Sequence, residues 1–331
     1  MNKILLTTAI AALTSASAMG DTWKYAIEES MDDVQGVFAQ SFKNYVEENS
    51  DHDIKIYPYG TLGESDDALE QAQAGIIEFV DQSPGFTGSL IPEAQIFFVP
   101  YLQPTEHDKL VKFFRESKVI NDEFPAIYAE QGLTLLKMFP EGELVITTKE
   151  PFTSPEEFEG MKIRVMTNPL VVETYKAFGA TPTPLPWGEV YGALQTNIVQ
   201  GQENPLFWVD SAKLYEVTDV ITFTGHNNFT TAVMANQDFY QGLSEEDQQL
   251  IADGMSAAFD EIVDYQKGLG EKSLANIQEK KPEIEVVELT DEQRQAFIDT
   301  REDVEAIYIE QAGERGKKLL EAFKADLDAV Q

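Results

Sequence analysis

The stretch Met161-Lys162-Ile163-Arg164-Val165-Met166 carries the residue on which the interpretation of this chain depends. Its alternation of apolar and polar residues predicts a short strand with Arg164 near the end. A Trp187 loop and a short helix follow, and the run closes with a predicted turn, Gly201-Gln202-Glu203-Asn204. A planar guanidinium binds a carboxylate through two parallel hydrogen bonds. This order of features predicts a pocket for a small carboxylate, although a lone arginine more often forms a structural salt bridge.

The first twenty residues have the pattern of a secretory signal peptide. Lys3 supplies the positive start, Ile4–Leu13 the apolar segment, and residues 15–20 the small-residue exit. We favour cleavage after Gly20, with Ala18 as the competing position. The expected location is therefore the periplasm. Without any cysteine, the chain is expected to fold without disulfides and to carry no lipid anchor at the cleavage site.

The composition is strongly acidic, with 58 Asp and Glu against 24 Lys and Arg and a formal net charge of −34. Such a surface is a poor partner for nucleic acid or an anionic membrane. No stretch after the signal is apolar for long enough to span a bilayer, so no direct membrane anchor is expected. Because the carboxylates are spread along the chain, we interpret them as a solubility adaptation to salty surroundings.

Strands alternate with helices along the chain. Expected strands over residues 23–27, 54–59 and 79–80 are separated by helices over 33–48 and 66–75, which predicts an α/β fold with a largely parallel sheet. In such sheets ligands bind beyond the carboxyl ends of the strands. The pattern restarts near residue 133, and the strands predicted in that part are 133–139, 144–148, 220–223 and 229–234.

A capping box at Ser244 opens a long helical pattern that ends before Pro282. A helix of about 37 residues would be roughly 55 Å long at 1.5 Å per residue. It is expected to brace two domains, with Gly268 or Gly270 as the place of a kink.

Together these motifs resemble the periplasmic solute-binding subunits of tripartite ATP-independent periplasmic (TRAP) transporters over essentially the whole mature chain. Segments 62–67, 83–90 and 180–189 resemble more narrowly the subunit of halophilic bacteria that binds ectoine and hydroxyectoine. The resemblance implies a two-domain periplasmic binding protein, or Venus flytrap, with crossing strands and a long bracing helix. We expect domain I over residues 21–143 plus about 232–270, and domain II over 144–231 plus about 271–331.

The resemblance also implies a ligand site and partners. Arg164 and Asn204 would hold the carboxylate of a small zwitterion of the ectoine class, and Glu29 would meet its cationic ring. Aromatic walls are implied at four positions, which we expect at strand ends or in loops: Phe86, Trp187, Trp208 and Phe229. The implied partner is the membrane permease of a TRAP transporter; no cofactor and no metal are expected, and a monomer is expected.

Three other functions are compatible with the sequence, one of them an extracellular sensor that presents its ligand to a membrane receptor. An enzyme is disfavoured because the chain has no cysteine nucleophile, no Gly-x-Ser-x-Gly motif and no histidine pair at metal spacing, since His52, His107 and His226 lie far apart. A binding protein for a C4-dicarboxylate or a sugar acid is the nearer alternative. Glu29 argues against a dianion, because it would repel a second carboxylate.

Overall fold

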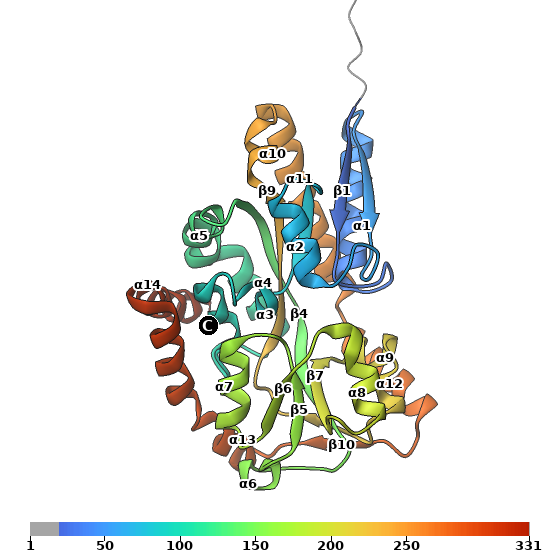
Figure 1. Cartoon of the computed structure of the whole chain (residues 1–331), viewed down its shortest axis with the longest axis vertical. Helices are drawn as coiled ribbons and strands as arrows, with labels where there is room; N and C mark the ends of the chain where they lie inside the picture. The colour runs from blue at the N-terminus through green and yellow to red at the C-terminus, as the bar shows by residue number, and fades with distance from the viewer. Residues whose placement is uncertain (1–19, 331) are drawn as a thin grey trace, which may run out of the picture.

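The computed structural model describes residues 20–330 and consists of two α/β lobes joined by strands that run through both (Figure 1). The first lobe holds the strands of residues 22–82, and the second lobe holds the short strands of residues 162–223. The predicted signal peptide falls on residues 1–19 and Gly20, so all but its last residue lies outside the described part of the chain.

The strands of residues 20–330 belong to one connected sheet. Its order is β2-β1-β3-β9-β4-β7-β5-β6, with β8 paired to β4 and β10 paired to β8. The strands of the first lobe are parallel to one another, as are β5, β6 and β7 of the second lobe. The bounds are β1 (Thr22–Ala26), β2 (Asp53–Tyr57), β3 (Phe79–Gln82), β4 (Leu133–Thr148), β5 (Lys162–Val165), β6 (Thr181–Pro184), β7 (Gly201–Pro205), β8 (Val220–Phe223), β9 (Asn228–Asn236) and β10 (Glu285–Glu288).

Two antiparallel strands connect the lobes. β4 pairs with β9 over Leu133–Glu143 and then continues along β7 as far as Thr148, while β9 also pairs with β3. The prediction of two strands over 133–139 and 144–148 is therefore wrong, because β4 is continuous. The pairing shifts register between Pro140 and Gly142, where Gly142 has a φ of 143°. A bulge of this kind lets a strand continue past a proline and a glycine that look like strand breakers.

Short helices cover the sheet in both lobes. In the first lobe, α1 begins after Asp33 as its apolar spacing predicts, and its Phe38 and Phe42 are fully buried. The first-lobe bounds are α1 (Val34–Asn49), α2 (Ser65–Gln73), α3 (Pro84–Thr87), η1 (Pro92–Phe98), α4 (His107–Glu116), η2 (Val119–Glu123), α5 (Phe124–Ala129) and α10 (Gln237–Gly242). Those of the second lobe are α6 (Pro155–Phe158), α7 (Pro169–Ala177), η3 (Trp187–Glu189), α8 (Val190–Gln195), α9 (Leu206–Ser211), η4 (Leu214–Glu216) and α13 (Asp291–Ile298).

The long bracing helix is two helices. α11 (Glu245–Tyr265) starts after Ser244, whose side chain caps it as predicted, and α12 (Leu269–Lys280) starts after Gly268. Gly268 has a φ of 72°, in the left-handed region that ends a helix instead of bending it. The glycine was correctly identified, but the expectation of one kinked helix is wrong. α11 packs on α1 and α12 packs on α9, so the pair still links the two lobes.

The C-terminal helix α14 (Arg301–Val330), interrupted at Gly313, also contacts both lobes. It runs beside α7 of the second lobe (Figure 1) and ends against the helices of the first. There Phe323 packs with ring centroids 5.5 Å from Phe97 and 4.7 Å from Phe113. The predicted division places residues 271–331 in domain II, yet the last turns of α14 lie on first-lobe helices.

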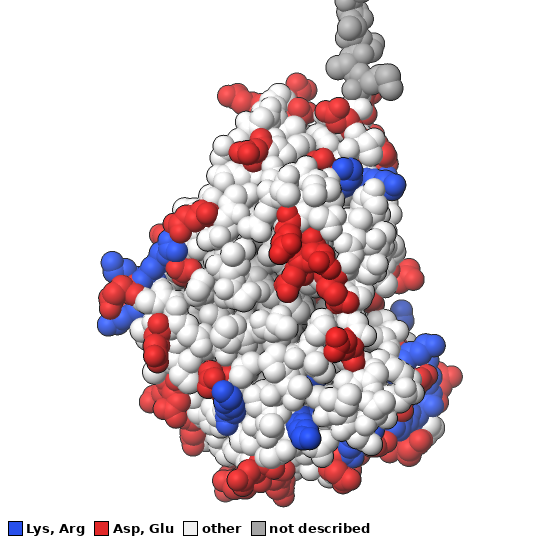
Figure 2. All heavy atoms as spheres, in the orientation of Figure 1, with Lys and Arg blue, Asp and Glu red and all other residues white. Residues whose placement is uncertain are grey.

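The surface is acidic, and no helix of residues 20–330 is both long enough and apolar enough to cross a bilayer. Figure 2 shows carboxylates scattered over the visible face, with a concentration over α2. The residues there are Glu64, Asp66, Asp67 and Glu70, all of them exposed.

Candidate functional site

Side chains of both lobes meet in a small enclosed space, the inner cavity, at the carboxyl ends of β1, β5 and β7. Its free volume is about 10 Å³, which is room for about one water. The lining consists of Glu28, Tyr59, Ser65 and Phe86 from the first lobe and Arg164, Met166, Trp187, Asn204 and Trp208 from the second.

A wider space, the outer groove, adjoins the inner cavity and has a volume of about 270 Å³. The two spaces share Glu28, Tyr59, Trp187 and Trp208 in their linings. Glu29, Ser30, Asp33 and Ser211 line the outer groove only. A separate cavity of about 350 Å³ shares no residue with either space.

Arg164 lies near the end of β5, as predicted, and its side chain is 1% exposed. Its Nε and Nη2 donate to the Leu185 carbonyl at 3.0 and 2.8 Å, and the guanidinium lies 5.9 Å from the Trp187 ring. Within residues 20–330 no carboxylate forms an ion pair with it. Burial lowers the pKa of Arg164 to about 10, an effect that the negative charge of Glu203 partly offsets. Arg164 is thus a buried cation, charged at neutral pH, without a paired anion.

The Glu203 carboxylate does not form an ion pair with Arg164 because it is hydrogen-bonded to other side chains. Its Oε2 accepts hydrogen bonds from Tyr175 at 2.7 Å and from His226 at 2.9 Å. Its charge therefore acts on Arg164 only from a distance. The guanidinium keeps donors on its cavity side for a ligand.

Asn204 lies in the inner cavity but not in a turn. Residues Gly201–Pro205 form β7, paired with β4 through Asn204 opposite Val145. The prediction of a turn is wrong because a continuous ladder to β4 satisfies this backbone. The Asn204 Nδ2 donates to Gln202 Oε1, and Gln202 Nε2 donates to Thr147 at 2.9 Å, which fixes the orientation of both amides.

The predicted aromatic residues form one stack and one separate wall. Trp187 and Trp208 are stacked with centroids 4.9 Å apart, and Phe229 packs behind Trp208 at 5.1 Å. Phe229 is 1% exposed and supports the stack without lining the inner cavity, whereas Phe86 lines it from the first lobe.

The expectation that these residues lie at strand ends or in loops is wrong for three of them. Phe86 is in α3, Trp187 in η3 and Trp208 in α9. α3 and α9 directly follow strands and contain only four and six residues. Helices of one turn are too short to show a helical period in the sequence.

The acidic residue that lines the inner cavity is Glu28, while the predicted Glu29 lines the adjoining outer groove together with Glu28. Glu28 Oε2 accepts from the Ser83 amide at 2.7 Å, while Oε1 is buried and has no donor among residues 20–330. Burial raises the pKa of Glu28 to about 8. Glu29 instead accepts from the Gln35 amide at 2.7 Å and faces Glu141, and burial and that second carboxyl raise its pKa well above normal. Successive residues after an extended strand point to opposite sides, so only one of the two enters the cavity.

Sequence reasoning also missed Tyr59, Ser65 and Met166. Tyr59 follows the end of β2, and its hydroxyl donates to Glu64 at 2.5 Å. Its place beyond a parallel strand was the signal that could have identified it. Asn168 has a structural role, since it caps α7 by accepting from the Leu170 and Val171 amides.

Comparisons with known proteins agree along the whole chain. The model of the family described as bacterial extracellular solute-binding protein, family 7, matches residues 25–311. The ectoine/5-hydroxyectoine-binding periplasmic protein UehA of Ruegeria pomeroyi is 63% identical over 321 residues, covering 97% of this chain and 95% of the relative.

Two solved structures have the same sequence identity to this chain but different TM-scores. A high-resolution structure of the periplasmic ectoine-binding protein from the TeaABC TRAP transporter of Halomonas elongata has a TM-score of 0.93 at 62% identity, covering 93% of this chain and all of that one. The ectoine-binding protein TeaA in its apo state has a TM-score of 0.83 at 62% identity, covering 94% and 100%.

The raised pKa of Glu28 predicts how stability depends on pH. Because the folded protein holds this proton more tightly than the unfolded chain, stability is lost as pH rises from about 5 to 8. Glu28→Gln should therefore match the parent near pH 5 and exceed it near pH 8, by on the order of 2–4 kcal/mol. Urea unfolding of the ligand-free protein at both pH values measures this. Exposed Glu70→Gln is the control, and equal pH slopes for Glu28→Gln and the parent would refute the prediction.

Proposed function

The chain belongs to family 7 of the bacterial extracellular solute-binding proteins, and we propose that it captures ectoine and hydroxyectoine and delivers them to the permease of a TRAP transporter. Proteins of this kind are receptors and not enzymes. We propose no catalytic role for any residue, no cofactor and no metal. Export through a cleaved signal peptide at residues 1–20, function in the periplasm and a monomeric state belong to the same proposal.

One arrangement carries this proposal: Arg164 and Glu28 present opposite charges to the same small cavity, with the Trp187–Trp208 stack beside them. Ectoine is a zwitterion with a carboxylate on a ring that bears a delocalised amidinium charge. Arg164 and Asn204 would bind the carboxylate in the inner cavity. Ectoine is larger than the one water for which that cavity has room, so its ring would extend into the adjoining outer groove, and Glu28, which lines both spaces, would bind the amidinium. The tryptophan stack and Phe86 would cover the ring through apolar contact and cation–π attraction.

The other predicted residues have supporting roles in this proposal. Phe229 holds Trp208 in place, and Glu29 contributes negative charge from the outer groove. The proposed two-domain division at residues 143–144 falls within β4, and the ligand would lie between the domains.

A C4-dicarboxylate or a sugar acid fits this cavity less well. A second carboxylate would lie near Glu28, with no second Lys or Arg in the lining to compensate it. A sugar acid has several hydroxyl groups to satisfy, whereas much of the wall is formed by Phe86, Met166, Trp187 and Trp208.

Closure of the lobes around the ligand is part of the proposal. Its support is the lower TM-score to the apo-state relative at unchanged identity, which reflects conformation and not sequence. The lobes touch at Gly188, where an added Cβ would lie 2.8 Å from Glu64 Oε1 and 3.2 Å from the Tyr59 hydroxyl. Glycine therefore allows η3 to approach the first lobe closely.

Removing Arg164 tests the proposal directly. Arg164→Ala would leave the ligand carboxylate buried without a cation and should cost about 3–5 kcal/mol, roughly a hundredfold to several thousandfold in affinity. Arg164→Lys keeps the positive charge but loses the two parallel hydrogen bonds, so its affinity should lie between those of the parent and Arg164→Ala. Calorimetry of the mature protein with ectoine, hydroxyectoine, malate, succinate and glucuronate measures both effects.

Exposed Arg115→Ala, which loses a surface pair with Asp260, is the control. Unchanged affinity for Arg164→Ala, or tighter binding of malate than ectoine, would refute the proposal.

The raised pKa of Glu28 predicts that ectoine binding releases a proton. With a pKa of about 8 it is largely protonated at pH 6.5 in the free protein. An amidinium favours the ionised form, so affinity should rise between pH 6.5 and 8 by up to about tenfold per unit. Calorimetry of ectoine binding in buffers of different ionisation enthalpy measures how many protons are released. Glu28→Gln should abolish the release and Glu29→Gln should retain it; the reverse result would restore Glu29 as the ligand contact.

The contact at Gly188 predicts a modest effect of an added methyl group. Gly188→Ala should displace the flexible end of Glu64 and its hydrogen bond to Tyr59, which weakens closure and reduces ectoine affinity by about fivefold. The matched control is Gly192→Ala, four residues away in α8, where an added Cβ meets nothing within 4 Å. Equal affinities for the two variants would show that η3 does not approach Glu64 in the bound state.

A further inference from the structure

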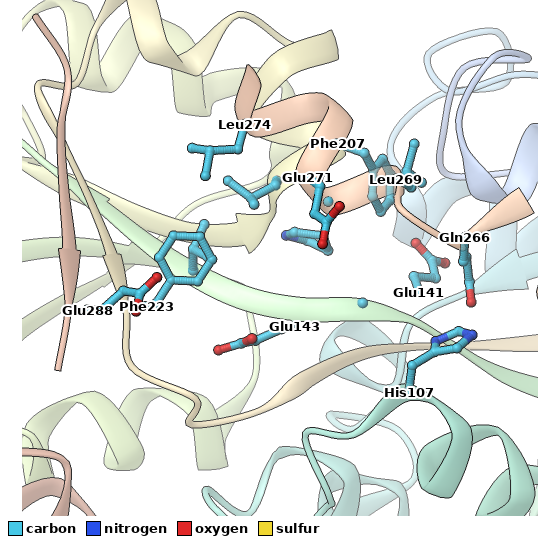
Figure 3. Close-up of a pocket in the computed structure, with 15 residues that line it drawn as sticks. His107, Glu141, Glu143, Phe207, Phe223, Gln266, Leu269, Glu271, Leu274 and Glu288 are labelled. Atoms are coloured by element: carbon cyan, nitrogen blue, oxygen red, sulfur yellow. The ribbon is translucent and has the colours of Figure 1, made fainter. Parts of the chain in front are cut away.

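The separate cavity of about 350 Å³ shares no residue with the inner cavity or the outer groove, and Figure 3 shows the residues that line it. We call it the hinge cavity, because it lies between β4, where the strand passes from one lobe to the other, and α12. We propose that the hinge cavity binds a small organic cation with an apolar body.

The size and the walls of the hinge cavity suit a small molecule. Its volume is about 350 Å³, within the range of small-molecule sites of about 300–1,000 Å³. Apolar side chains of three different elements line it: Phe207 of α9, Phe223 of β8, and Leu269 and Leu274 of α12. An occupant would therefore be covered by apolar groups from several directions.

The polar groups of the lining define the charge of the occupant. Four carboxyl groups belong to it, Glu141, Glu143, Glu271 and Glu288, and no lysine or arginine does. Burial raises the pKa of Glu141 and Glu143, so the exposed Glu271 and Glu288 carry most of the negative charge. A carboxylate ligand, including the zwitterion proposed for the inner cavity, would be repelled here. A quaternary ammonium or amine would be attracted, and its alkyl groups would pack on the apolar side chains.

Two buried polar atoms at one end of the hinge cavity have no hydrogen-bond partner among residues 20–330. Glu141 is 2% exposed; its Oε1 accepts from Gln35 and Thr231, while Oε2 has no donor of that kind and the carboxyl group also faces Glu29 of the outer groove. His107 Nε2 is likewise buried and unpaired. Figure 3 shows Glu141, His107 and Gln266 converging at this end, with Glu143, Phe223 and Glu288 at the other.

A metal ion is a poorer candidate for this site. Hard cations require several oxygens gathered within about 2.6 Å of one point. Within residues 20–330 no three His, Asp or Glu side chains are arranged to hold a metal. The carboxylates are spread along the cavity, as a larger cation with diffuse charge requires.

The hinge cavity is lined by elements that pack on different lobes. Gln266, at the end of α11, donates to the Pro140 carbonyl of β4 at 2.7 Å, and α12 begins directly after Gly268. α11 packs on the first lobe and α12 on the second. The occupant would thus contact the junction of the two lobes without touching the residues proposed to hold ectoine.

Choline is the cation that tests the proposal. The matched control compound is its neutral isostere, in which a carbon atom replaces the nitrogen. Amide NMR spectra of the mature protein should show saturable shifts with millimolar choline around β4 and α12, and much weaker ones with the isostere. Glu271→Gln should weaken choline binding by up to about fivefold, whereas Glu279→Gln, on the same helix outside the cavity, should not. Leu274→Trp should fill the cavity and abolish binding while ectoine affinity stays unchanged.

Four results would overturn the assignment. These are no saturable shifts with choline, equal binding of the isostere, equal effects of Glu271→Gln and Glu279→Gln, or shifts confined to Arg164 and its neighbours. Ectoine binding by each variant reports that it is folded, so a loss of choline binding can be read as loss of the site.

Discussion

The unpaired guanidinium of Arg164 is the constraint on which the rest of the site depends. A buried charge without a partner is costly, and the protein offsets that cost only in part, through the Leu185 carbonyl and the face of Trp187. Glu203 could neutralise it, but Tyr175 and His226 hold that carboxylate away. Closing the lobes on an empty site therefore leaves a cation buried alone. In the proposed function a ligand carboxylate would remove this penalty, which would couple anion recognition to closure.

Glu28 places the same kind of constraint on the other side of the inner cavity. Its burial favours the neutral acid, so it becomes fully charged only when a cation is present. In the proposed function the two residues together would select a molecule with both charges at a short separation. A lone cation would leave Arg164 unpaired, and a lone anion would gain nothing from the neutral Glu28 acid.

Much of this arrangement was predictable from the sequence, and the failures have physical causes. Arg164 was found because the end of a strand is a local feature, whereas the aromatic residues came from the family resemblance and three of the four lie in short helices. Glu28 was missed because two adjacent acids are equivalent in sequence, and only the direction of the chain after β1 separates them. Asn204 was placed in a turn because pairing with β4 is a long-range contact. Gly268 was recognised as special, but whether a glycine bends or ends a helix depends on its φ, which the sequence does not specify.

The two uninterrupted strands between the lobes determine which motions the protein can make. A ladder of backbone hydrogen bonds resists sliding and stretching, but it twists and bends readily. Rotation of one lobe against the other is then distributed over the many residues of β4 and β9, each changing its dihedral angles by a small amount. No single rotatable bond controls the movement, so it should be insensitive to most single substitutions along these strands.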